Sequence, residues 1–291
     1  MALTPYRRIL DTCVPYLVAR EPVVRDLDRS PLGIPLDQAH LFDPQVVRNG
    51  PFLELLKRLD ELTYGARSLQ MPSWVFYDCA VIPGAVFGFA RPAAALAPWV
   101  RQTLQVPDDY DGLVPMSLFI AIPMAHREAR LVYSLDSINQ VASGAAPEGL
   151  WRLTLAAGTA ALGIDVMVAT VQWRSPRLAL YASLGPLKVM TAWTPAHDIC
   201  ETATLYVFTD DAARERLLHG AAGTTQADRY LDADSYEEMA ALQREIEEGL
   251  DVWVVGPPEI RGADTRIPLA TTKPAAGAVR QKDTFRRRFQ G

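Results

Sequence analysis

Residues 165–210 read DVMVATVQWRSPRLALYASLGPLKVMTAWTPAHDICETATLYVFTD. Runs rich in β-branched and other apolar residues predict strands at 166–173, 187–193 and 202–208. Between the first two runs, residues 176–183 are predicted to form a short helix. The order strand, helix, strand, strand indicates an α/β (α+β mixed) fold with a central mixed sheet flanked by helices.

The residues before this stretch supply further elements of such a fold. Leucines and Phe52 recur at helical spacing over 52–62, with charges between them, which predicts an amphipathic helix. The runs WVFYDCAVI and AVFGFAR flank Pro83-Gly84 and predict a hairpin. Residues 130–141 fit either a strand or a helix start, and we favour the strand. The other expected elements are a helix at 93–104, a buried strand in MSLFIAIPM and an alanine-rich helix at 150–162.

Composition limits the class of protein. The chain has 291 residues, 49% of them hydrophobic and 22% charged, which is ordinary for a globular protein and argues against wholesale disorder. The net charge of −5 makes non-specific nucleic-acid binding unlikely. Three cysteines without a CxxC pair argue against a disulfide framework. With no long apolar run, we expect a soluble cytoplasmic protein without membrane partners.

The predicted organisation has four parts. Residues 1–50, rich in proline, arginine and aspartate, are expected to form an N-terminal arm, and residues 51–210 the α/β domain. Residues 211–255 are expected to be a mainly helical C-terminal addition. Residues 256–291 are expected to form an extended tail that ends in the basic sequence RQKDTFRRRFQG.

Over about residues 52–210, this order of elements resembles the GNAT acyltransferase superfamily. Two strings carry the resemblance: PGAVFGFA (83–90) is similar to the family's hairpin, and Arg174-Ser175 followed by LYASLG (180–185) is similar to its final helix and turn. The resemblance implies a sheet that splays open at its centre. Acyl-coenzyme A would enter there, with its pantetheine along a strand edge.

The resemblance also implies roles for particular residues. Tyr181 would be a general acid that protonates the departing thiolate, because a thiol of pKa near 8.5 leaves poorly while charged. The alternative for Tyr181 is an aromatic residue packed between helix and sheet.

The implied cofactor site follows the strand LFIAIP (118–123), which is similar to the family's central strand. We assign Ile120 and Ile122 of that strand to cofactor binding, together with Arg127 in one register of the cofactor loop and Gly149 in another. Neither register keeps the family's glycine pair, whose backbone N–H groups cradle a pyrophosphate. Acyl-CoA, a carrier-protein thioester, another ligand or no acyl donor therefore all remain open.

Acceptor activation has two candidates. His197 has an unperturbed pKa near 6.5, which suits a base at neutral pH, although a turn histidine that caps backbone groups is the alternative. Asp78, predicted on the first hairpin strand, would need a partner if it pointed inward. A metal at His197, Cys200 and Glu201 has weak support because no partner cluster accompanies them.

The function expected is acyl transfer from a thioester to an unknown acceptor. A catalytically silent GNAT-like module, which uses its terminal arms to bind partners, is the alternative from another class. The basic tail at 280–291 would dock on an acidic surface of a protein partner or of a second copy in a homo-oligomer, or remain solvated. A cysteine hydrolase built on Cys79 and His197 has only residue identity in its favour.

Overall fold

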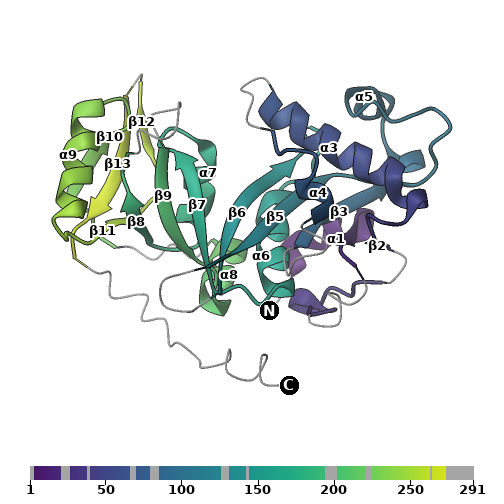
Figure 1. Ribbon diagram of the computed structural model, residues 1–291, viewed down its shortest axis with the longest axis horizontal. Helices are drawn as coiled ribbons and strands as arrows, with labels where there is room; N and C mark the ends of the chain where they lie inside the picture. The colour runs from purple at the N-terminus through teal and green to yellow at the C-terminus, as the bar shows by residue number, and fades with distance from the viewer. Residues whose placement is uncertain are drawn as a thin grey trace.

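A computed structural model describes residues 3–20, 27–37, 40–65, 70–78, 85–125, 131–141, 144–193, 202–220, 225–262 and 264–272. The strands of these residues form one mixed sheet, in the order β10-β13-β11-β8-β9-β7-β6-β5-β3-β1-β2 (Figure 1). Helices pack on it along its length. The predicted fold class is therefore confirmed.

The strand bounds show how the sheet is built from both ends of the chain. They are β1 Val14–Val18, β2 Leu41–Phe42, β3 Ala85–Pro92, β4 Leu113–Pro115, β5 Ser117–Ala125, β6 Leu131–Gln140, β7 Val166–Gln172, β8 Leu187–Thr191, β9 Thr202–Phe208, β10 Arg229–Asp232, β11 Val252–Val254, β12 Glu259–Arg261 and β13 Asp264–Ala270. The strands β4 and β12 lie off the main path and pair with β3 and β13.

The helix bounds follow the same numbering. The principal helices are α1 Arg7–Thr12, α3 Gly50–Tyr64, α4 Val75–Asp78, α5 Pro98–Thr103, α6 Leu150–Ala161, α7 Pro176–Ala182, α8 Asp211–His219 and α9 Tyr236–Glu247. Helix α6 connects β6 to β7, which run parallel, as a crossover connection requires. It lies close against β5 at Gly158, where an added Cβ would be 2.6 Å from Cδ1 of Phe119.

A chain of buried hydroxyl groups holds the β1–β3–β5 part of the sheet to α6. Tyr16 crosses over Gly88, and its hydroxyl donates to the carbonyl of Ser117 (2.7 Å). The Ser117 hydroxyl accepts from the backbone N–H of Phe89 (3.1 Å) and is hydrogen-bonded to the hydroxyl of Thr154 in α6 (2.7 Å). These side chains are fully buried, and the Thr154 hydroxyl also bonds to the carbonyl of Leu150 (2.7 Å), so each hydroxyl of the chain has a protein partner.

A buried arginine joins strand ends in the other part of the sheet, which contains β7 and β9. Arg214 in α8 donates to the carbonyls of Ile164 (3.1 Å) and Thr209, and to the carboxylate of Asp211 (2.9 Å). Ile164 lies just before β7 and Thr209 just after β9, so one side chain joins the ends of two neighbouring strands. Burial is the main cause that raises the pKa of nearby Asp165, while Arg214 lowers it.

Most elements predicted for 150–210 are confirmed. The strand expected at 202–208 has those bounds, the helix at 150–162 is α6, and the favoured strand at 130–141 is β6. Residues 211–255, expected to be mainly helical, contain α8 and α9 but also β10 and β11, which belong to the sheet.

The predictions for the ends of the chain and for the first hairpin strand need correction. The expected arm contributes β1, which pairs with both β2 and β3, and the expected tail contributes β12 and β13. Residues 75–78 form α4 instead of a strand, so the hairpin prediction is wrong for its first half. Residues 79–84 and 273–291 lie outside the described part of the chain.

Gly88 gives the first testable prediction. An added Cβ would lie 2.1 Å from the Ser117 carbonyl oxygen and 2.5 Å from the Tyr16 hydroxyl, so Gly88→Ala must displace a buried hydrogen bond. We expect a loss of roughly 3 kcal/mol in the free energy of unfolding, measured by urea denaturation.

Gly50→Ala is the matched control, because Gly50 has no heavy atom within 4 Å of the added Cβ and begins α3. This control is expected to be neutral or slightly stabilising. Equal stability of the two variants would contradict the packing described for Tyr16.

Candidate functional site

The parallel strands β6 and β7 separate soon after they meet. They pair only at Tyr133 with Met167, Ser134 with Val168 and Leu135 with Ala169. Beyond these pairs, residues 136–140 of β6 and 170–172 of β7 are not paired with each other; we call this region the β6–β7 fork. In Figure 1 the two parts of the sheet fan apart from this contact.

An irregularity in β6 coincides with the start of the fork. The register between β5 and β6 passes from Ile120 with Ser137 to Ala121 with Leu135, which leaves Asp136 without an opposing residue. Such a bulge bends its strand and increases the local twist. Two effects therefore turn β6 away from β7 at the same point: the bulge, and the end of the β6–β7 pairing.

Helix α7 places a charged side chain across the fork. The helix begins after Ser175, whose hydroxyl accepts from the N–H of Arg177 (3.3 Å). The Nε of Arg177 donates to the carbonyl of Ile138 in β6 (3.4 Å), and its guanidinium lies 5.7 Å from the ring centroid of Trp151 in the first turn of α6. One side chain thus contacts both β6 and α6 from the β7 side.

Tyr181 lies four residues after Arg177 on the same helix. Residues at this spacing share one helix face, so Tyr181 lies on the face whose first turn reaches β6. Its side chain is 3% exposed and belongs to the main apolar core. This burial fits the interpretation of Tyr181 as an aromatic residue packed between helix and sheet, and its role as an acid stays a prediction.

The turn after α7 explains the last glycine of the LYASLG string. Gly185 has φ +137, and an added Cβ would be 2.9 Å from a guanidinium nitrogen of Arg216. Arg216 in α8 donates through Nε to the carbonyl of Leu184 (2.7 Å). The glycine is therefore required by backbone geometry and by this contact, with no need for a catalytic role.

The segment before α6 contains two glycines in the left-handed region, Gly144 with φ +109 and Gly149 with φ +81. The face of Gly149 is covered, because an added Cβ would be 2.8 Å from Cε1 of Tyr6. The Tyr6 hydroxyl donates to the carbonyl of Leu218 (2.8 Å). Burial raises the pKa of this phenol, against a lowering effect of Arg152, so it stays a donor at neutral pH. Only part of this segment is open to a ligand.

The other predicted site residues lie in β5, in α4 or outside the described residues. Ile120 and Ile122 are in β5, whose two edges pair with β3 and β6, so the strand edge that faces the fork belongs to β6. Asp78 ends α4 rather than lying on a strand, which removes the strand-face argument for it. Arg127 and His197 lie outside the described residues, as do Cys79, Cys200 and Glu201.

Two residues at the fork were missed from the sequence. Arg177 could have been found from its spacing of four residues before Tyr181 on a predicted helix. The contact of Trp151 with Arg177 depends on the tertiary fold, so no local pattern could have indicated it. Within the described residues, no cluster of three or more His, Cys, Asp or Glu side chains is suited to a metal ion.

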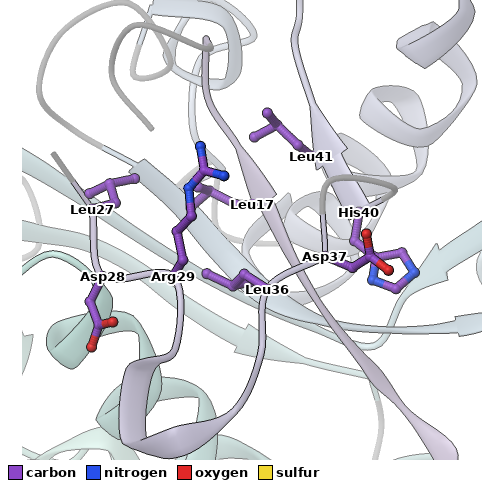
Figure 2. Close-up of a pocket in the computed structure, with 8 residues that line it drawn as sticks. All are labelled: Leu17, Leu27, Asp28, Arg29, Leu36, Asp37, His40 and Leu41. Atoms are coloured by element: carbon purple, nitrogen blue, oxygen red, sulfur yellow. The ribbon is translucent and has the colours of Figure 1, made fainter. Parts of the chain in front are cut away.

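A small hollow lies away from the fork, between β1 and residues 27–41. Figure 2 shows its lining, which includes Leu17, Leu36 and the polar side chains of Asp37 and His40. Its volume is about 20 Å³, which holds about one water molecule. It is too small to be a substrate site.

The comparisons with known proteins give a distant likeness of fold. No protein-family model and no curated protein matches the chain. A chain in the structure described as the NatC complex bound to Gag peptide and CoA matches with a TM-score of 0.40 and 14% identity, over 57% of this chain and 96% of that chain. No residue's role follows from so distant a likeness. No helix in the described residues is long and apolar enough to span a membrane.

Proposed function

We propose that this protein is a divergent GNAT-type acyltransferase, which moves an acyl group from a thioester to an acceptor. The observation that carries the proposal is the β6–β7 fork: two parallel strands open after three residue pairs, and the helix that follows β7 bears Arg177 and Tyr181 on one face. The fork lies between strands of one sheet, and a ligand with amide groups would lie along the edge of β6 there, as an added strand does.

The thioester donor is a substrate with two amide groups in its pantetheine arm and, for acyl-CoA, phosphates at its far end. The β6 edge at residues 136–140 would hydrogen-bond the amides in exchange for its present contacts, such as that of Ile138 with Arg177. Arg177 would turn from the carbonyl of Ile138 to a phosphate, because a guanidinium binds an oxyanion more strongly than a neutral carbonyl. The positive, N-terminal end of the α6 dipole lies near Trp151 and would also favour the negative charge of the phosphate.

The proposed reaction is an acyl transfer in which one proton is donated to the leaving group and one is lost by the acceptor. The acceptor's nitrogen or oxygen attacks the thioester carbonyl, the new bond forms, and the carbon–sulfur bond breaks. Tyr181 gives its phenolic proton to the departing thiolate, and the proton lost by the acceptor passes to a base and from there back to Tyr181. His197 and Asp78 stay the candidate bases.

One observation favours a second candidate, a catalytically silent GNAT-like binding module. In the structure the fork is bridged by the protein's own side chain, since Arg177 contacts both Ile138 and Trp151. Tyr6 also covers Gly149 at the start of α6. If these contacts are permanent, they fill the space that a thioester donor needs.

Arg177→Met separates the two candidates. If Arg177 binds a phosphate of acyl-CoA, the variant should bind acetyl-CoA at least about ten-fold more weakly in calorimetric titration, since a charge-assisted hydrogen bond is lost. Arg261→Met removes the same charge from an exposed ion pair in β12 and should bind like the wild type. Tighter binding of acetyl-CoA by Arg177→Met would show that the arginine side chain blocks the donor site, and it would support the silent module.

Tyr181→Phe tests the proposed acid. The ring and its packing are kept, so acetyl-CoA should bind with unchanged affinity, while turnover should fall roughly 100-fold or more. Turnover is measured as release of free thiol from acetyl-CoA with water as the acceptor. Tyr230→Phe, on the half-exposed tyrosine of β10, is the control. Equal turnover in the Tyr181 and Tyr230 variants would remove Tyr181 from the mechanism.

A further inference from the structure

The fork continues into a pocket of about 400 Å³ between α3 and α5. The pocket is lined by Leu59 and Leu62 of α3, by Trp99 and Thr103 of α5, and by Gln140. Because Gln140 is also the last residue of the β6 edge, the pocket begins where that edge ends and extends the same site. Pockets that bind small molecules span roughly 300–1,000 Å³, so this one can hold a substantial part of a substrate.

The lining of the pocket favours an uncharged, apolar occupant. No charged side chain is among the described lining residues. The hydroxyl of Thr63 donates to the carbonyl of Leu59 (3.3 Å), and that of Thr103 donates to the carbonyl of Trp99 (2.8 Å), so both hydroxyl donors are used within their own helices. A charged group would lose its hydration in the pocket without gaining a partner of opposite charge.

The pocket mouth carries large apolar side chains in contact with solvent. Trp99 is 48% exposed and Leu62 is 43% exposed, and both line the pocket. Exposed apolar surface beside a pocket is typical of a binding site, because an occupant removes that surface from water. A hydrocarbon group would therefore be stabilised by the mouth as well as by the interior.

The place of the pocket along β6 indicates which substrate fills it. In the proposed function, Arg177 exchanges the carbonyl of Ile138 for a phosphate of the donor, and the N-terminus of α6 favours the same phosphate. The donor's phosphate end then lies toward the C-terminal end of β6, and its acyl end lies toward Asp136. Gln140 is on the other side of Ile138 from Asp136. The acyl chain thus extends away from the pocket, which leaves the pocket to the acceptor.

We propose that this pocket binds a hydrocarbon group of the acceptor, whose nucleophilic nitrogen or oxygen meets the donor near Asp136. Four residues of extended strand separate Gln140 from Asp136, which is about 13 Å. A primary amine or alcohol on a long alkyl chain has the required shape: an apolar end and a distant nucleophile. The role as acceptor rests on the proposed function, whereas the preference of the pocket for a hydrocarbon group does not.

The binding test uses N-phenyl-1-naphthylamine, an uncharged fluorophore whose emission rises in apolar surroundings. It should bind the protein saturably. Primary alkylamines should displace it, and lengthening the chain from butylamine to decylamine should raise affinity about four-fold per methylene until the pocket is full. The matched control is decane-1,10-diamine, which should displace the fluorophore at least about ten-fold less well than decylamine, because one of its two charged ends would have to enter the pocket.

Variants that add a charge locate the binding. Leu62→Glu and Thr103→Glu place a carboxylate at the pocket from α3 and from α5, and each should weaken binding of the fluorophore at least about ten-fold. Val47→Glu, on a side chain that is 93% exposed just before α3, and Gln102→Glu, beside Thr103, are the controls and should bind as the wild type does. A melting curve for each variant shows that it is folded.

Release of thiol from acetyl-CoA tests the role as acceptor. Decylamine should have a lower KM than butylamine, and Leu62→Glu should reduce that difference while its calorimetric titration with acetyl-CoA stays like the wild type's. Equal KM values for the two amines would overturn the acceptor role. Displacement of the fluorophore by octanoyl-CoA but not by acetyl-CoA would also overturn it, because the hydrocarbon group would then be the acyl chain of the donor.

Failure of the pocket and failure of the proposed function give different results. The pocket is contradicted if the wild type shows no saturable fluorescence, or if both Leu62→Glu and Thr103→Glu bind the fluorophore as the wild type does, even when acetyl-CoA binds. Binding of the fluorophore and of decylamine without binding of acetyl-CoA would contradict the proposed function and the acceptor role, and would support the hydrocarbon preference of the pocket.

Discussion

The limited pairing of β6 with β7 is the constraint on which the rest of this structure depends. Three residue pairs join the two parts of one sheet, and the Asp136 bulge turns β6 away where the pairing stops. Each further pair would add hydrogen bonds worth about 0.5–1.5 kcal/mol apiece, so the open fork has a cost in stability. Two clusters of buried polar contacts in other parts of the protein offset this loss of stability.

These clusters hold each part of the sheet independently of the fork. On one side, the hydroxyls of Tyr16, Ser117 and Thr154 connect three strands with α6. On the other side, Arg214 joins the ends of β7 and β9 to α8. The side-chain hydrogen bonds of both clusters are made by residues outside 136–140, although Gln140 lies opposite Ser117 in the β5–β6 register. The contacts that the fork makes toward β7 can therefore change while both clusters keep their hydrogen bonds. This separation of stability from the candidate site is what a ligand-binding strand edge requires.

The sequence predicted the elements whose patterns are local. Residues 202–208 alternate regularly and form β9 with the expected bounds, and the apolar faces of 150–161 form α6. Predictions from local patterns were wrong where tertiary contacts determined the secondary structure. Residues 75–77 are β-formers, yet the N–H of Val75 bonds to the carbonyl of Pro72 and begins a helical turn. The strand β13 lies in the segment expected to be an extended tail, and the carbonyl of its Pro268 accepts from the N–H of Val255.

The candidate site was predictable only in part for the same reason. The helix that carries Tyr181 followed from local sequence, but the hydrogen bond from Arg177 to Ile138 spans 39 residues. Such contacts are set by the crossing of elements, which no local pattern encodes.

Hydrogen–deuterium exchange of the protein with and without acetyl-CoA tests the central claim, that the β6–β7 fork receives the ligand. The account predicts slower exchange of amides within 136–140 when acetyl-CoA binds, with no change in β12 and β13 at the far end of the sheet. Binding of acetyl-CoA that leaves 136–140 unprotected would contradict it.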